Sequence, residues 1–288
     1  MKNICHVGLP KTGTTYLQRR YFPKSKNYNV VTSDEIFHPA FHFIYALNKN
    51  YDCAGIPFRR RRLSGGEHNI KARFWAEEVR RYRGNDKRPL LLSCEGLVGV
   101  SFAPIRNIIN NALIIREVLS TEKVIFVFRK QHDYAESLYR QMIFEEDRFG
   151  NYIEPIDFIS VNSSSCSLSS SIELNWLYVY QSYCSVFGVE NVLALPYELM
   201  KSDFSSFSYK ISEFIGEKIS LEDEDINSKE RISKKISYYP RNKNLQFEKF
   251  SPVFKKQLIE QHFSSNKMLS FLIGIDLSLW GYHDAIEN

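Results

Sequence analysis

The residues best suited to chemistry in this chain lie near its N-terminus, where Lys11 to Thr15 reads Lys-Thr-Gly-Thr-Thr. An ammonium group, hydroxyls and backbone N–H groups brought together in a tight turn favour an anion of phosphate size. The apolar run over residues 3–9 predicts a buried strand before this turn, and residues 14–19 can begin a helix after it. Gly8 and Gly13 let the backbone curl between the two elements. The segment therefore predicts a strand, a phosphate-binding loop and a helix in succession.

The loop differs from the Walker A pattern of nucleoside triphosphatases, G-x-x-x-x-G-K-[ST], in the place of its lysine. Gly8, Gly13 and Thr15 fit that pattern, but Thr14 stands where the lysine belongs. The lysine is inside the loop instead, at Lys11, where it would lie over the first group beyond a 5′-phosphate. This arrangement favours a phosphate that carries one more small charged group.

Here the sequence resembles the sulfotransferases that use 3′-phosphoadenosine 5′-phosphosulfate (PAPS), whose 5′-phosphosulfate loop reads P-K-[TS]-G-[TS]-[TS]. The stretch from Pro10 to Thr15 matches it completely. The resemblance implies that Lys11 is catalytic, facing the oxygen that departs with the product PAP, and that no metal is required. It also implies that the cofactor is bound by Pro10, Lys11, Thr12, Gly13, Thr14 and Thr15, whose threonines offer N–H and hydroxyl donors to the 5′-phosphate.

A second motif supports the resemblance. The apolar run Val124 to Phe128 predicts a central strand that ends at Arg129, and a helical pattern with Ser137 in it follows. In the family, an arginine at the end of such a strand and a serine eight positions later bind the 3′-phosphate of the cofactor. Arg129 and Ser137 match that spacing. A guanidinium group suits bidentate contact with phosphate oxygens, and a hydroxyl can donate to a third oxygen.

The general base for the acceptor hydroxyl has several candidates. Glu95 ends the apolar strand that begins near residue 89, so its carboxylate is expected at the active-site edge of the sheet, where bacterial relatives often have Ser-x-Glu. His42 is the rival, and His38, four residues earlier, could share one helix face with it. Glu35 is a further candidate, because one branch of the family uses a glutamate soon after the loop helix. The two histidines lack an evident third ligand, so a metal site is not expected.

The pattern along the chain predicts an α/β fold with a P-loop NTPase-like parallel sheet flanked by helices, as a single domain over residues 1–288. Further strands are predicted at residues 28–32, 89–94 and 191–195. Helical patterns are predicted near residues 69–83, 104–119, 131–146, 172–187 and 204–215. Ligands of such sheets bind beyond the carboxyl ends of the strands, where the loops at Gly8, Cys94, Arg129 and Tyr197 would converge.

Composition limits the cellular setting and the partners. The net charge of +5 is modest and favours anionic ligands, but no segment resembles a nucleic-acid-binding tail. No apolar stretch approaches 18 residues, the N-terminal run lacks a signal-peptide pattern, and the five cysteines include no C-x-x-C pair. Family members of the Golgi have an N-terminal anchor that is not evident here. We therefore expect a cytoplasmic bacterial enzyme without a transmembrane segment.

These features together predict a PAPS-dependent sulfotransferase acting on a hydroxyl of a carbohydrate, such as a capsular, exopolysaccharide or lipid-linked glycan. Residues 266–282 resemble the C-terminal ending of many bacterial carbohydrate sulfotransferases. The basic run Arg59 to Arg62 would suit an anionic acceptor, although a solvated loop is the commoner explanation of such a run. Candidates for a cofactor-closing loop are Arg231, Lys234 and Arg241. Two alternatives stay open, namely a kinase-like phosphotransferase and a nucleotide-binding module without catalysis.

Overall fold

The protein is built on one parallel sheet of five strands. The structure is a computed structural model that describes residues 2–32, 73–74, 77–81, 84–95, 108–144, 174–220 and 249–283. Its strands lie in the order β2-β3-β1-β4-β5, and every neighbouring pair is parallel. Their bounds are Asn3–Gly8 (β1), Asn29–Thr32 (β2), Leu90–Glu95 (β3), Thr121–Phe128 (β4) and Val192–Pro196 (β5).

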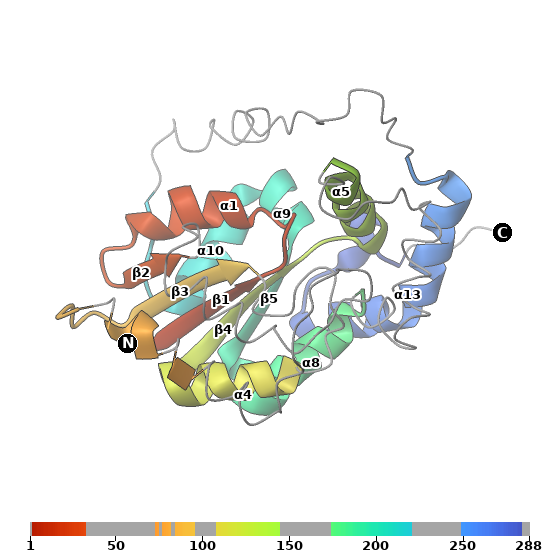
Figure 1. The fold of residues 1–288 in the computed structure, drawn as a ribbon. Coiled ribbons are helices and arrows are strands. Elements are labelled where there is room, and N and C mark those ends of the chain that lie inside the picture. The colour runs from red at the N-terminus through yellow and green to blue at the C-terminus, as the bar shows by residue number, and fades with distance from the viewer. Residues whose placement is uncertain are drawn as a thin grey trace.

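Helices cover both faces of this sheet (Figure 1). One face carries α1 (Thr14–Tyr16) with its π-helical continuation (Leu17–Tyr21), α9 (Tyr197–Ser202) and α10 (Phe204–Ile215). The other carries α4 (Ile108–Leu119) and α8 (Trp176–Phe187), with α5 (Gln131–Phe144) and α13 (Pro252–Ile273) beyond them. Short 3-10 turns are formed by Phe22–Lys24, Val189–Asn191 and Leu277–Trp280.

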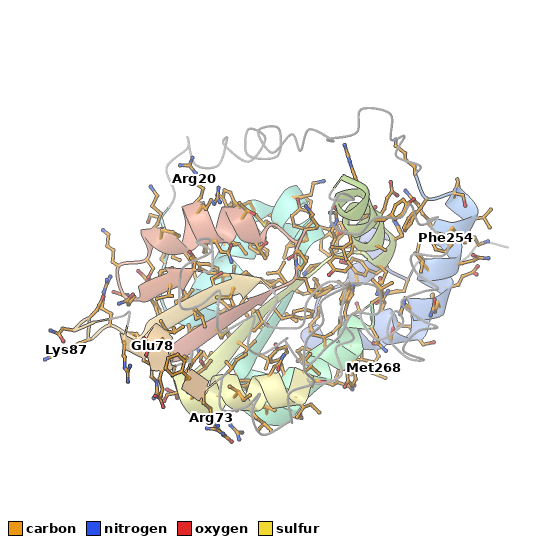
Figure 2. All side chains as sticks on the ribbon, viewed as in Figure 1. Arg20, Arg73, Glu78, Lys87, Phe254 and Met268 are labelled. Atoms are coloured by element: carbon orange, nitrogen blue, oxygen red, sulfur yellow. The ribbon has the colours of Figure 1, made fainter. Side chains whose placement is uncertain are left out.

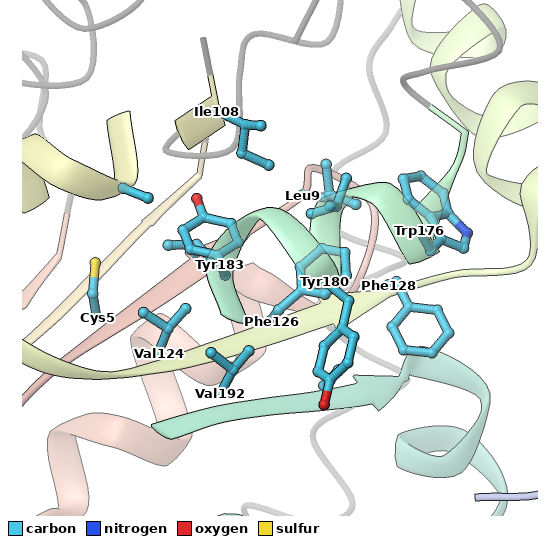
Figure 3. Close-up of a cluster of buried hydrophobic side chains, with 14 of the residues drawn as sticks. Cys5, Leu9, Ile108, Val124, Phe126, Phe128, Trp176, Tyr180, Tyr183 and Val192 are labelled. Carbon is cyan, nitrogen blue, oxygen red and sulfur yellow. The ribbon is translucent and has the colours of Figure 1, made fainter. Parts of the chain in front are cut away.

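Alternation along the strands divides the core into two clusters. Ile4, Ile125 and Val127 point toward α1, α9 and α10, where they join Tyr21 and Phe207. The intervening strand residues point to the opposite face and pack against α8. Figure 3 shows this second cluster, in which Trp176 lies beside the strand end at Phe128 and Tyr183 lies over Cys5 and Val124. Both faces are therefore closed to water, as the continuous apolar strands require.

Local signals explain where the helices begin and end. Asn175, Asp203 and Ser251 each accept a hydrogen bond from a backbone N–H of the first turn of α8, α10 and α13, respectively. Gly216 and Gly274 end α10 and α13 in the left-handed conformation. These caps fix where α8, α10 and α13 begin and where α10 and α13 end.

Most predicted elements are confirmed, and one large element was missed. All five strands lie within a few residues of the predicted ranges, and the described parts of the predicted helices are helical except at Leu174 and Asn175, which precede α8. The 22-residue helix α13 was not predicted. Its apolar residues are spread around the helix, with Phe271 82% exposed while Leu258 and Leu269 are buried, so helical periodicity is weak.

The surface of the described residues is polar and charged over much of its extent. Arg20, Arg73 and Lys87 project outward from the ribbon (Figure 2). Arg73 pairs with Glu117 at 2.8 Å, and both side chains are about half exposed, so the pair adds little stability. Within the described residues, no helix has the length and apolar character needed to cross a membrane.

Candidate active site

The site lies where the chain turns in opposite directions across the sheet. β1 and β4 are neighbours, yet the chain leaves β1 toward β2 at one edge and leaves β4 toward β5 at the other edge. A crevice beyond the carboxyl ends of the strands forms at such a point and is the usual ligand site of an open α/β sheet. The loop after β1 and the residue after β4 therefore face the same space (Figure 1).

The loop Leu9 to Gly13 is held in one conformation by its own residues. Lys11 has a φ of 66° and Gly13 a φ of 79°. A left-handed lysine is uncommon and strained, which is a feature of functional loops. The Thr12 hydroxyl donates a hydrogen bond of 2.6 Å to the Leu9 carbonyl and is fully buried. The two left-handed residues reverse the chain so that the loop wraps around a point beyond β1.

The Thr12 hydroxyl corrects one expectation from the sequence. We expected the hydroxyls of all three loop threonines to be offered to the ligand, but that of Thr12 is used to close the loop. The binding of an anion by Thr12 stays a prediction and, with the hydroxyl bonded to Leu9, would use its backbone N–H. Thr15 is partly exposed, whereas Thr14 is buried. The Thr14 methyl group packs so closely on Gly8 that a Cβ atom added to Gly8 would overlap it.

Arg129 joins the end of β4 to this loop. Its Nη1 donates to the Lys11 carbonyl at 3.2 Å, across 118 positions of sequence. Its guanidinium carbon lies 5.3 Å from the centre of the Tyr197 ring, at the start of α9. The side chain is half-buried, so a cation is held next to the phosphate-sized loop. The predicted meeting of Lys11 and Arg129 is thus observed.

The main chain after Arg129 is fixed by side chains from three other elements. The Arg129 carbonyl accepts from Trp176 Nε1 at 2.8 Å, and the Lys130 N–H donates to Glu198 Oε1 at 3.1 Å. The other carboxylate oxygen of Glu198 accepts from the Tyr282 hydroxyl at 2.7 Å. Burial, together with the Glu198 charge, raises the pKa of Tyr282 well above its ordinary value, so this hydroxyl keeps its proton.

Asp133, in the first turn of α5, is a carboxylate close to the cations that follow β4. Burial alone would raise the pKa of Asp133. The hydrogen bond and charge of His132, with the charges of Lys130 and Arg129, instead lower that pKa to about 2. The carboxylate of Asp133 is therefore ionised near neutral pH and offsets part of the positive charge of Arg129 and Lys130.

A neutral histidine supports the base of the loop. His6 lies on β1 two residues before Gly8, and its Nδ1 is 2.7 Å from the Ser93 Oγ of β3. Gln18 Nε2 donates to the Ser93 carbonyl at 3.1 Å, which ties the helix after the loop to the same strand. Burial lowers the pKa of His6 to about 3, so His6 is uncharged near neutral pH and serves the packing under the loop.

Comparison with known proteins decides the family. The chain matches the sulfotransferase domain family over residues 2–270. The chain belongs to this family. Members of the family use PAPS as the sulfuryl donor, so this sulfotransferase is a PAPS-dependent enzyme. Among curated proteins, none matches it significantly.

Two solved sulfotransferase structures resemble this chain. A sulfotransferase from Alicyclobacillus acidocaldarius superposes with a TM-score of 0.61 at 15% identity, covering 97% of this chain and 98% of that one. A mouse sulfotransferase complexed with PAP gives a TM-score of 0.48 at 16% identity, covering 95% of this chain and 87% of that one. The first likeness shows that the five-stranded sheet and its helices are the sulfotransferase fold.

The residues of the site fit an anionic nucleotide. The left-handed loop with its backbone N–H groups and the cationic side chains of Lys11 and Arg129 are the kind of donors that phosphate groups require. Ser137 lies half-buried in the second turn of α5, the helix that follows Arg129. No three His, Cys, Asp or Glu side chains among the described residues are grouped as a metal site.

The predicted bases are less well defined by the structure. Glu95 is the last residue of β3 and pairs with Gly8 in the sheet register, so its main chain is at the same edge as the loop. His42, His38 and Glu35 lie outside the described residues, and so do Arg59 to Arg62 and the candidate closing residues. The assignment of the base stays a prediction.

Sequence reasoning did not recognise the residues that surround Arg129. Trp176, Glu198 and Tyr282 come from α8, α9 and the C-terminal turn. The loop at Tyr197 was expected at the carboxyl edge of the sheet, but the sequence gave no indication that Glu198 contacts the strand end of β4. Such a contact depends on the strand order and is not visible in a periodic pattern.

Proposed function

We propose that this sulfotransferase transfers the sulfuryl group from PAPS to a hydroxyl of a carbohydrate, such as a capsular, exopolysaccharide or lipid-linked glycan. The observation that supports this best is the contact of Arg129 with the Lys11 carbonyl, because it brings the two predicted phosphate-binding elements into one crevice. The carbohydrate acceptor is supported by the C-terminal ending over residues 266–282, which resembles that of bacterial carbohydrate sulfotransferases.

Each side chain has a defined role in this proposal. PAPS, when bound, supplies the sulfuryl group and the bridging oxygen that leaves with PAP. Lys11 stabilises the negative charge on that oxygen. The N–H groups from Thr12 to Thr15 bind the 5′-phosphate, and Arg129 with Ser137 binds the 3′-phosphate. Glu95 takes the proton of the acceptor hydroxyl, with His42 as the alternative base.

Nucleotide selectivity tests the assignment of the donor site. PAP should raise the melting temperature far more than ADP or ATP does, with or without Mg²⁺, because only PAP has a 3′-phosphate for Arg129. Arg129→Ala should weaken PAP binding by about 1.5–3 kcal/mol, the range for a hydrogen bond to a charged group. Stronger stabilisation by ATP in the presence of Mg²⁺ would favour a phosphotransferase instead.

A second arginine provides the control. Arg116 of α4 donates to the Val186 carbonyl at 2.8 Å, so Arg116→Ala also removes an arginine-to-carbonyl bond but lies on a helix away from the loop. It should leave the PAP affinity unchanged. A screen of sugar acceptors with labelled PAPS then tests the reaction itself. PAP binding without transfer to any acceptor would indicate the non-catalytic nucleotide-binding module.

A further inference from the structure

The peptide group between Arg129 and Lys130 is held at both of its polar atoms by side chains. Its carbonyl accepts from Trp176 Nε1 at 2.8 Å, and its N–H donates to Glu198 Oε1 at 3.1 Å. These two bonds fix the plane of the peptide on the C-terminal side of Arg129. The direction in which the Arg129 side chain leaves the main chain is therefore set by α8 and α9 and not by β4 alone.

Glu198 is itself held by the end of the chain. The Tyr282 hydroxyl donates to Glu198 Oε2 at 2.7 Å, so both carboxylate oxygens have a hydrogen-bond donor. Hydrogen bonds to an ionised carboxylate are shorter and stronger than neutral ones, and two of them on separate oxygens leave the group little freedom to rotate. The orientation of Glu198 thus depends on Tyr282.

Tyr282 is held in place by residues that precede and follow Arg129 in the sequence. Its ring meets the Phe128 ring edge-on, with centroids 5.8 Å apart, and the side chain is fully buried. Its carbonyl accepts from Asn266 Nδ2 at 2.9 Å. Asn266 in turn exchanges two hydrogen bonds with the Gln131 amide, at 2.7 and 3.0 Å. Tyr282 therefore contacts Phe128, the residue before Arg129. It is linked to Lys130 through Glu198 and to Gln131 through Asn266.

We infer that Glu198 and Tyr282 are positioning residues that aim Arg129 at the 3′-phosphate and so set the preference of this sulfotransferase for 3′-phosphorylated nucleotides. This inference rests on the proposed assignment of Arg129 to that phosphate. A bidentate guanidinium–phosphate contact requires a defined direction, and a misplacement of about 1 Å is enough to weaken it strongly. The loop that receives the 5′-phosphate is closed separately, by the Thr12 bond to Leu9.

The test compares two nucleotides that differ only in the 3′-phosphate, PAP and 5′-AMP. Tyr282→Phe keeps the ring and removes the hydroxyl that orients Glu198. It should weaken PAP binding roughly fivefold or more while 5′-AMP binding changes less than about twofold. The selectivity ratio, which is the dissociation constant of 5′-AMP divided by that of PAP, therefore falls. Glu198→Gln, which keeps the shape and removes the charge, should lower the same ratio. Calorimetric titration of the full chain measures both.

Tyr28 provides a matched control for the loss of a buried tyrosine hydroxyl. Its hydroxyl donates to the Ile215 carbonyl at 2.7 Å, beneath α10. Tyr28→Phe should lower the melting temperature as Tyr282→Phe does, yet leave the selectivity ratio at the wild-type value. A lower melting temperature with an unchanged ratio in both tyrosine variants would show that Tyr282 only stabilises the fold, and would overturn the inference.

Arg129→Ala separates this inference from the proposed function. If Tyr282 acts through Arg129, adding Tyr282→Phe to Arg129→Ala should cause no further fall in the ratio, whereas independent effects would multiply. A full further fall in the double variant would overturn the positioning role while the assignment of Arg129 stands. An unchanged ratio in Arg129→Ala alone would reject that assignment and the inference with it.

Discussion

A methyl group added at Gly13 would meet two separate obstacles. The backbone φ there is 79°, a left-handed conformation, which costs an L-residue about 1–2 kcal/mol. The added Cβ would lie 2.8 Å from Met200 Sδ and 3.0 Å from Tyr197 Cε2. Overpacking in a well-filled interior costs about 1–3 kcal/mol. We therefore expect Gly13→Ala to lower the free energy of unfolding by about 2–5 kcal/mol.

Gly216 isolates the backbone part of this cost. Its φ is 75°, close to that of Gly13, but a Cβ built there has no atom within 4 Å. Gly216→Ala should therefore lower the free energy of unfolding by only about 1–2 kcal/mol. Urea denaturation of both variants at the same pH gives the comparison. If Gly13→Ala destabilises no more than Gly216→Ala, the contacts with Met200 and Tyr197 do not restrict the loop and the reasoning is refuted.

Met200 isolates the steric part. It is buried, so Met200→Ala alone should lower the free energy of unfolding by about 2–5 kcal/mol. In the double variant the space left by Met200 receives the Gly13 methyl group. The free energy of unfolding of the double variant should therefore exceed, by roughly 1 kcal/mol or more, the value predicted by adding the effects of the single changes. Strict additivity would contradict the close approach of α9 to the loop.

The remaining predictions concern catalysis, the acceptor and pH. Lys11→Ala should lower kcat about a hundredfold or more with the fold intact, because charge stabilisation in the transition state is lost. Glu95→Gln should lower turnover with PAP affinity retained, whereas full activity in that variant together with loss in His42→Ala would reassign the base. Neutralising Arg59 to Arg62 should raise the acceptor KM and flatten its salt dependence, since screening lengths shrink from about 10 Å at 0.1 M salt to 3 Å at 1 M; identical kinetics would mean that the run is only surface. Burial lowers the pKa of His6 from 6.5 to about 3, so the unfolded chain takes up this proton first and stability falls as the pH drops from 6.5 toward 3, by about 1.4 kcal/mol per pH unit. Urea midpoints at a series of pH values should have a shallower slope in His6→Asn, and an equal slope would exclude His6 as the source.

The sequence could predict the parts of the site that are formed by consecutive residues. The loop from Pro10 to Thr15 is recognisable because a tight turn between a strand and a helix needs glycine and hydroxyl residues at fixed positions. The strands are recognisable because buried parallel strands are continuously apolar, as in Val124 to Phe128. Alternation of such strands with helical patterns also implied the layered fold. The match of Arg129 to its motif came from the family resemblance.

Other features depend on how distant segments meet. The strand order β2-β3-β1-β4-β5 puts β1 beside β4, and this alone allows Arg129 to reach the Lys11 carbonyl. The Thr12 hydroxyl has two possible partners, the ligand and the Leu9 carbonyl, and only the folded loop decides between them.

The support of Arg129 is likewise a property of the tertiary structure. Glu198 and Tyr282 are 84 positions apart in sequence, and either could have been an ordinary surface side chain after a strand or a turn. Sequence by itself determined the local elements and the chemistry of the loop, because these follow from neighbouring residues and their periodicity. The orientation of Arg129 was decided only when α8, α9 and the C-terminal turn packed around the end of β4, because hydrogen bonds between segments so far apart in sequence leave no local pattern to read.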